Sequence, residues 1–178
     1  HHGQEYVDYE DNGIRNIIMI EPLNEAFAVL SKNMPDGVLC YRLAIGNENK
    51  VIEINVDTTN GGMSSSVLEP LLHKEQYPNV LFEKTELVNM SRFDDMNLDK
   101  SKYNMLNIDV QGYELEVLKG AVDFLRGIDL LYCEVNRAEL YRGCPDVSAI
   151  DDFLTDFIRV ETNWIGDNWG DAVYIRKT

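Results

Sequence analysis

The chain has 178 residues, of which 44% are hydrophobic and 10% aromatic, and this composition fits one soluble globular domain with a single sizeable core. Sixteen Lys and Arg residues against 31 Asp and Glu residues give a net charge of −15. Such a field would repel a phosphate backbone, so a nucleic-acid substrate is disfavoured. No apolar run approaches the roughly 18 residues that a membrane span needs, and the visible N-terminus does not resemble a signal peptide.

Three cysteines are present, Cys40, Cys133 and Cys144, and no two of them form a CxxC pair. Neither a disulfide framework nor a zinc knuckle is therefore expected. Cys40 and Cys133 fall inside apolar runs, where cysteine behaves as a small hydrophobic residue. A reducing, cytoplasmic setting is the simplest interpretation.

In the first half of the chain, short apolar runs alternate with a helical pattern. The run at 16–20 predicts a buried strand, and residues 22–34 repeat apolar side chains at helical spacing behind a proline. Residues 37–45 predict a second strand and residues 50–56 a third that is half exposed. The polar, glycine-rich stretch at 57–66 predicts a loop.

The second half continues the alternation and ends in a strand pair around the turn IGDNWG. The predicted elements are strand-like segments in 79–93, a strand at 103–110, a helix at 113–127, a strand at 128–135, a helix at 148–158, and two strands at 159–164 and 171–177. Strands alternating with helices indicate an α/β protein with a mostly parallel sheet covered on both faces. Ligands of such sheets bind outside the carboxyl ends of the strands.

Two acidic residues occupy that ligand side, and Glu21 is the first of them. It closes the strand NIIMIE, where an acid commonly accepts hydrogen bonds from the ribose hydroxyls of a nucleotide-like cofactor. The alternative is a solvated acid that is stabilised by the dipole of the following helix.

Asp109 is the second, at the end of the apolar strand in NMLNIDVQGYELEVLKGA. Gly112 permits a tight turn after it, and Glu114 falls in the first turn of the next helix, where negative charge is favourable in any protein. Asp109 lies on the ligand side or half buried, where an unpaired charge is costly. We therefore expect a functional role for Asp109.

At this point the residues resemble a known family. MLNIDVQGYELEVLKGA is similar to the signature of the FkbM-type methyltransferases, a branch of the S-adenosylmethionine-dependent enzymes. Further segments resemble the family in the same order along almost the whole chain. They are HHGQ, MIEPLNEAF, YRLAIGNENKVIEI, GGMSSSVLEP, SRFDDM and LLYCEVN.

The resemblance implies a Rossmann-like class I methyltransferase fold with an antiparallel C-terminal strand, in a single domain over residues 1–178. It also implies that the first strand and most of the glycine loop are missing from the N-terminal side. The cofactor would be S-adenosylmethionine, with Glu21 on the ribose and Pro22 shaping the adenine side. The other implied cofactor contacts are Gly3 and Gln4 near the methionine portion, Ala44, Ile45 and Gly46 over the adenine, and Asp109 beside the transferred methyl.

The family resemblance implies O-methylation of a hydroxyl on a sugar or another small-molecule or glycan acceptor. Ser64, Ser65 and Ser66 would line the acceptor side, although a mobile turn is an equal alternative. An aspartic acid with an ordinary pKa near 3.9 is a poor base for a sugar hydroxyl unless it is desolvated or helped. Asp109 could accept the proton late, or a divalent metal held with Glu134, which ends the neighbouring strand, could acidify the hydroxyl.

A metal is possible but not favoured, because the one histidine away from the N-terminus, His73, lies in an ordinary helical segment. Trp164 and Trp169, together with Tyr141 next to Arg142, could form a sugar-stacking platform, but tryptophans near a terminal turn more often pack in the core. Two other functions remain open. One is a non-catalytic binding protein on a degenerate methyltransferase fold, and the other is a nicotinamide-dependent oxidoreductase, which would leave the IDVQGYE segment unexplained.

Overall fold

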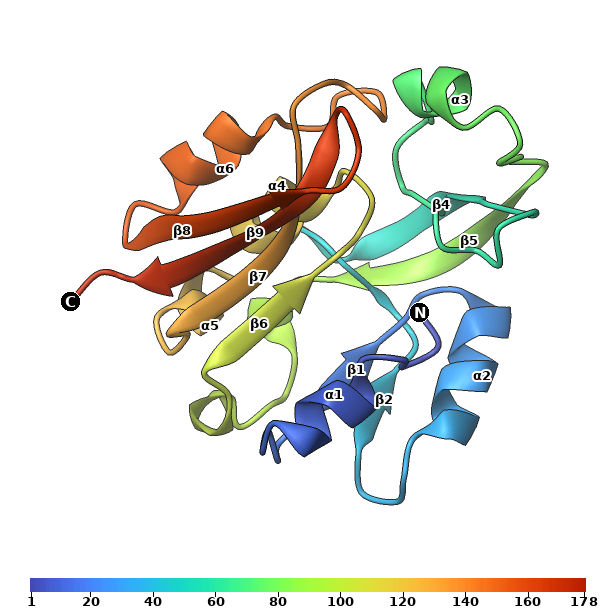
Figure 1. Ribbon diagram of the computed structural model, residues 1–178. Coiled ribbons are helices and arrows are strands. Elements are labelled where there is room, and N and C mark those ends of the chain that lie inside the picture. The colour runs from blue at the N-terminus through green and yellow to red at the C-terminus, as the bar shows by residue number, and fades with distance from the viewer.

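The computed structural model describes all 178 residues, His1–Thr178. Strands and helices alternate along the chain, and the strands form three separate sheets of two, three and four strands (Figure 1). The predicted α/β class is confirmed. The strands are not joined into the single, mostly parallel sheet that the sequence predicted. They are divided among three sheets, and the larger two of these contain both parallel and antiparallel pairs.

The first sheet is a β–α–β unit. Strand β1 (Ile18–Ile20) runs parallel to β2 (Leu39–Tyr41), and α2 (Asn24–Asn33) connects them. The helix buries Ala26 and Leu30, which repeat at helical spacing as expected.

The second sheet has the order β3-β5-β4. Strand β3 (Ala44–Ile45) is parallel to β5 (Lys84–Ser91), and β4 (Lys50–Val56) is antiparallel to β5. The prediction of a single strand at 37–45 was therefore wrong. This segment forms two strands, because β2 pairs with β1 whereas β3 pairs with β5, and the chain passes from one sheet to the other between them.

The third sheet has the order β6-β7-β9-β8. Strands β6 (Met105–Ile108) and β7 (Leu130–Asn136) are parallel. The final hairpin, β8 (Phe157–Trp164) and β9 (Trp169–Arg176), is antiparallel, and β9 also pairs antiparallel with β7. The expected antiparallel C-terminal strand is thus present.

The helix predicted at 113–127 is two short helices, α4 (Glu114–Lys119) and α5 (Val122–Leu125). Gly120 ends the first of them and packs directly on the backbone of Gly46. A Cβ at Gly120 would lie 1.8 Å from the Gly46 carbonyl oxygen, so the close approach requires glycine.

The remaining helices are short. Helix α6 (Val147–Phe153) ends earlier than predicted, because Phe157 and Ile158 join β8 instead. Helix α1 (Tyr6–Asp11) was not predicted, and α3 is Leu72–Gln76. Two 3₁₀ turns complete the elements, Phe93–Asp95 and Lys100–Lys102. None of the helices has the length and apolar character that crossing a bilayer requires.

Two hydrophobic cores result from this division. The larger has 16 buried residues and packs α4, α5 and α6 against β6, β7 and β9. The smaller has eight and packs the start of α2 against β3, β4 and β5, with Ile52, Ile54 and Val56 buried on one face of β4. Figure 1 shows the β1–β2 unit lying beside β6, which belongs to the larger core.

Strand β1 has an open edge on the side away from β2. The N–H of Glu21 donates to the carbonyl of Tyr41, and backbone groups of successive strand residues point to alternate sides. The N–H and C=O groups of Ile18 and Ile20 therefore point away from β2, where no strand is paired with them.

Strand β6 has a matching open edge on the side away from β7. The N–H of Leu130 donates to the carbonyl of Asn104, so the same alternation directs the backbone groups of Met105 and Asn107 away from β7. The open edges of β1 and β6 line the same cavity.

Candidate active site

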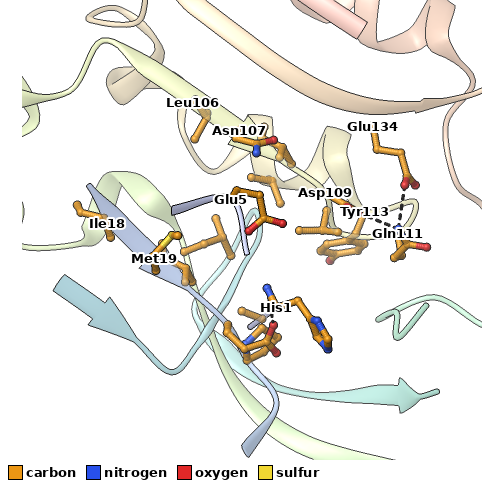
Figure 2. Close-up of a pocket in the computed structure, with 18 of the residues that line it drawn as sticks. His1, Glu5, Ile18, Met19, Leu106, Asn107, Asp109, Gln111, Tyr113 and Glu134 are labelled. Carbon is orange, nitrogen blue, oxygen red and sulfur yellow. Dashed lines mark hydrogen bonds and ion pairs between the residues drawn. The ribbon is translucent and has the colours of Figure 1, made fainter. Parts of the chain in front are cut away.

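One cavity of about 1030 Å³ reaches from the open edges of β1 and β6 to the carboxyl ends of β6 and β7. Figure 2 shows Ile18 and Met19 of β1 on one side of it and Asp109, Gln111 and Glu134 on the other. Both acids that the sequence placed on the ligand side, Glu21 and Asp109, line this cavity. Each of them directly follows the last residue of its strand, as predicted.

A tight turn joins β6 to α4 and shapes one wall of the cavity. Its central residues, Gln111 and Gly112, have φ values of 54° and 94°, in the left-handed region that favours glycine. The carboxylate of Glu114 stabilises the turn, because its Oε1 accepts the N–H groups of Val110 at 3.1 Å and Gly112 at 3.0 Å. Gln111 is thereby held in a conformation that non-glycine residues rarely adopt.

The side chain of Gln111 bridges the two candidate catalytic acids. Its Nε2 donates to Asp109 Oδ1 at 2.7 Å and to Glu134 Oε2 at 2.9 Å, and Figure 2 shows the three side chains together. The hydroxyl of Tyr141 lies 2.9 Å from Gln111 Oε1, which fixes the amide orientation. Asp109 and Glu134 lie side by side as predicted, since the parallel register pairs Ile108 with Cys133 directly before them.

Burial raises the pKa of all three acids in this cluster. The pKa of Glu134, whose side chain is buried, is raised well above its ordinary value, first by burial and then by repulsion from Asp109 and Glu114. Burial raises the pKa of Glu114 to about 7. The pKa of Asp109 is also raised by burial, although the Gln111 hydrogen bond opposes the shift. The cluster therefore retains protons that ordinary carboxyls release.

Asp109 differs from the other two acids because it is exposed in the cavity, whereas Glu134, which also lines the cavity, and Glu114 are buried. The surrounding protein still removes much of its hydration, which explains its raised pKa. A higher pKa makes this carboxylate a better proton acceptor than an ordinary aspartate.

Glu21 is buried at the end of β1, with 7% of its surface exposed. Its Oε1 accepts the N–H of Leu23 at 2.8 Å, which fixes the carboxylate, and its Oε2 lies 3.3 Å from the backbone nitrogen of His1. Burial raises the pKa of Glu21, while the Leu23 hydrogen bond lowers it. The alternative interpretation of Glu21, a solvated acid, is wrong because the residue is buried.

The other expected cofactor contacts divide into two groups. Those that line the cavity are Gln4, Pro22, Ala44 and Ile45. Gly3 and Gly46 do not line it. A Cβ at Gly3 would lie 2.8 Å from Leu30 Cδ1, and one at Gly46 would lie 2.3 Å from Met90 Sδ, so both glycines instead permit close packing around the site.

Ser64, Ser65 and Ser66 line the cavity, but the three hydroxyls make different contacts. Ser66 donates to the Gln111 carbonyl at 2.7 Å and accepts the N–H of Leu68, and Ser65 accepts the N–H of Asp57. Ser64 Oγ makes no hydrogen bond to another residue. Two of the three serines therefore support the loop and the β6–α4 turn, and Ser64 alone presents a hydroxyl without a partner.

The roles of three further residues were not expected from the sequence, although Tyr141 was a candidate for the sugar-stacking platform. Gln111 and Tyr141 complete the carboxyl cluster, and His73 lines the cavity from α3. A glutamine directly before a turn glycine was the available signal for Gln111, because a side chain next to a strand-end acid is well placed to contact it. No local pattern signals Tyr141 or His73, which reach the site from distant segments.

No group of three or more His, Cys, Asp or Glu side chains is arranged to hold a metal ion.

The fold and the site together define an α/β protein whose ligand cavity lies at acid-bearing strand ends. The family described as "Methyltransferase FkbM domain" matches residues 1–159, so the chain belongs to the FkbM methyltransferase family. No solved structure gives a significant match to the chain.

A curated relative is the 2-O-methyltransferase NoeI of Sinorhizobium fredii (strain NBRC 101917 / NGR234). The two sequences are 28% identical over 150 residues, and the match covers 79% of this chain and 62% of the relative. The chain thus spans less than two thirds of the relative's length. The family and this relative are both described as methyltransferases.

Glu114 generates a prediction on stability. Its pKa in the folded protein is about 7 against an ordinary value of 4.5, so between these pH values the folded state holds a proton that the unfolded chain releases. The free energy of unfolding therefore falls as the pH rises from 4.5 to 7, by up to about 3 kcal/mol from this group. We expect Glu114→Gln to flatten that decline, measured by urea unfolding across the pH range.

Glu116→Gln is the control, because it removes a carboxylate from the same helix and so controls for the change in net charge. If the Glu114→Gln and wild-type stability profiles were superimposable between pH 4.5 and 7, a neutral buried Glu114 would be ruled out.

Proposed function

We propose that the protein is an S-adenosylmethionine-dependent O-methyltransferase that acts on a hydroxyl of a sugar or another small-molecule or glycan acceptor. The observation that carries this proposal is that the buried Glu21 and the Asp109–Gln111–Glu134 cluster line one cavity. An acid suited to a ribose diol and an acid suited to proton transfer would thus share one ligand space.

The residues present fit this cofactor. A fixed, buried carboxylate at Glu21 can accept hydrogen bonds from both hydroxyls of a ribose. Pro22, Ala44 and Ile45 offer apolar surface for an adenine ring, with Gly46 following them. Gln4 lines the cavity near His1 and would contact the methionine portion.

When bound, the cofactor supplies a methyl group activated by a sulfonium. The chain's part is to align an acceptor hydroxyl and to remove its proton. Asp109 would accept this proton at a carboxylate oxygen, and its raised pKa suits it to that role. Gln111 would hold Asp109 in place, and Glu134, buried with a strongly raised pKa, would stay protonated and so leave the charge of the cluster on Asp109. Asp109 and Glu134 would lack a third ligand for a divalent ion, so this proposal does not include a metal.

We further propose that the three sheets belong to one Rossmann-like sheet that is completed between β1 and β6. Both open edges face one cavity, and each could pair with a parallel strand at about 4.8 Å. Such a strand would join the β2-β1 pair to the β6-β7-β9-β8 sheet. The first strand expected from the family resemblance is the segment we assign to this position.

The cofactor assignment predicts different effects of two acid substitutions. Glu21→Gln should weaken binding of S-adenosylhomocysteine about 10- to 100-fold, because charge-assisted hydrogen bonds to the diol are lost. Asp109→Asn should retain most of this affinity and lower kcat by about 100-fold or more, as expected for the loss of a general base. Calorimetric titration measures the first effect, and methyl transfer from radiolabelled cofactor measures the second.

Glu25→Gln is the matched control, since Glu25 lies in the first turn of α2 and is exposed. Equal affinities of the Glu21→Gln, Glu25→Gln and wild-type proteins for S-adenosylhomocysteine would refute the ribose contact.

The strand assignment is tested by amide hydrogen exchange on the protein with its natural flanking residues. We expect protection at four amides that have no partner in the present sheets, those of Ile18, Ile20, Met105 and Asn107. The amides of Met19 and Leu106, which face existing partners, serve as internal references. Rapid exchange at the four edge amides beside protected references would contradict the strand.

A further inference from the structure

The cavity has a second region beyond the carboxyl cluster, which we call the aromatic end. It consists of His73 of α3, Tyr77 and Val80 after it, Leu140 after β7, and Trp169 of β9. None of these side chains carries a fixed charge. The family match assigns no role to any of them, and the sequence suggested a role only for Trp169, as part of a sugar-stacking platform.

His73 is the central side chain of the aromatic end. It is only 5% exposed, and its ring packs against those of Tyr77 and Tyr141 with centroid distances of 4.9 and 5.2 Å. Its Nδ1 has no hydrogen-bond partner, although buried polar atoms are nearly always paired. Burial lowers the pKa of His73, so the ring is neutral and offers one donor and one acceptor.

The aromatic rings around His73 are fixed by hydrogen bonds. Trp169 Nε1 donates to the Tyr77 hydroxyl at 2.8 Å. Asn136 pairs with Trp169 across the β7–β9 ladder, and both polar atoms of its buried amide also lack partners. Two neighbouring segments at this end thus bury polar side chains whose hydrogen-bonding capacity is unused.

Short contacts connect the aromatic end to the candidate base. The His73 ring packs on Tyr141, the Tyr141 hydroxyl lies 2.9 Å from Gln111 Oε1, and Gln111 donates to Asp109. The same Tyr141 hydroxyl lies 2.9 Å from the carbonyl of Ser64, whose own hydroxyl is free. A molecule seated at the aromatic end would therefore be linked to Asp109 through Tyr141 and Gln111, within the same cavity.

We propose that the aromatic end is the acceptor subsite and that it binds a neutral pyranose ring; this inference rests on the proposed function. Aromatic rings offer apolar surface to the C–H faces of a sugar. A neutral imidazole and the Ser64 hydroxyl can each donate to or accept from sugar hydroxyls. No lysine or arginine lines this end to pair with a phosphate, and the net charge of −15 disfavours an acidic sugar.

The test is a titration of uncharged methyl pyranosides, chosen from the gluco, manno, galacto and 6-deoxy series, into the protein with its natural flanking residues. It is carried out with and without S-adenosylhomocysteine and followed by NMR of the His73 imidazole. We expect at least one glycoside to shift the His73 resonance and its binding to weaken about threefold to tenfold in His73→Phe, which keeps the ring packing and removes both nitrogens.

Trp169→Phe should weaken glycoside binding as well, because it loses the hydrogen bond that fixes Tyr77. Trp164→Phe is the matched control, since Trp164 lies across the same β8–β9 turn, stacks with Arg137 and does not line the cavity. Affinity for S-adenosylhomocysteine should be unchanged in all three variants, which separates acceptor binding from cofactor binding.

The outcomes are distinguishable. If S-adenosylhomocysteine binds but no glycoside shifts His73, or if His73→Phe binds glycosides as tightly as the Trp164→Phe control, the acceptor subsite is refuted and the cofactor proposal stands. If glycosides bind at His73 but S-adenosylhomocysteine does not bind, the subsite stands as a sugar site and the proposed methyl transfer fails.

Discussion

The buried carboxylate of Glu114 holds the turn on which the rest of the candidate site depends. By accepting two backbone N–H groups it stabilises left-handed conformations at Gln111 and Gly112, and so directs the Gln111 side chain back toward the strand ends. Gln111 then bridges Asp109 and Glu134. A single interaction at the start of a helix thus fixes three side chains of the cavity wall.

The same arrangement explains the electrostatics of the site. Burial raises the pKa of all three acids, and repulsion from Asp109 adds to the shifts of Glu114 and Glu134. The amide of Gln111 is the only side chain that donates to two of them. Asp109 and Glu134 both line the cavity, but only Asp109 is exposed there, whereas Glu134 and Glu114 are buried. Because the most deeply buried acids retain protons most readily, the residual charge is concentrated on the residue that faces the ligand space.

Much of this arrangement follows from the sequence. The acids at strand ends, the side-by-side position of Asp109 and Glu134, and the final antiparallel strand depend on strand periodicity and on the parallel register, which local patterns indicate. The split of residues 37–45 between two sheets and the break of the predicted helix at Gly120 could not be foreseen, because each depends on a tertiary partner, β5 in one case and Gly46 in the other.

The contacts of Tyr141 and His73 were beyond prediction for a similar reason. Tyr141 reaches Gln111 from 30 residues away in the chain, and His73 meets Tyr141 only because α3 folds over the loop after β7. Periodicity reports which face of an element is buried, but not which other element covers it. Sites assembled from several loops therefore exceed what a single sequence reveals.

The central claim is that one cavity holds the methyl donor between Glu21 and Asp109. A crystal structure of the protein with its natural flanking residues and bound S-adenosylhomocysteine tests this most directly. The account predicts ribose hydroxyls on the Glu21 carboxylate, the adenine against Ala44 and Ile45, and the sulfur facing Asp109. A ligand bound away from Glu21, or with its sulfur directed away from Asp109, would contradict it.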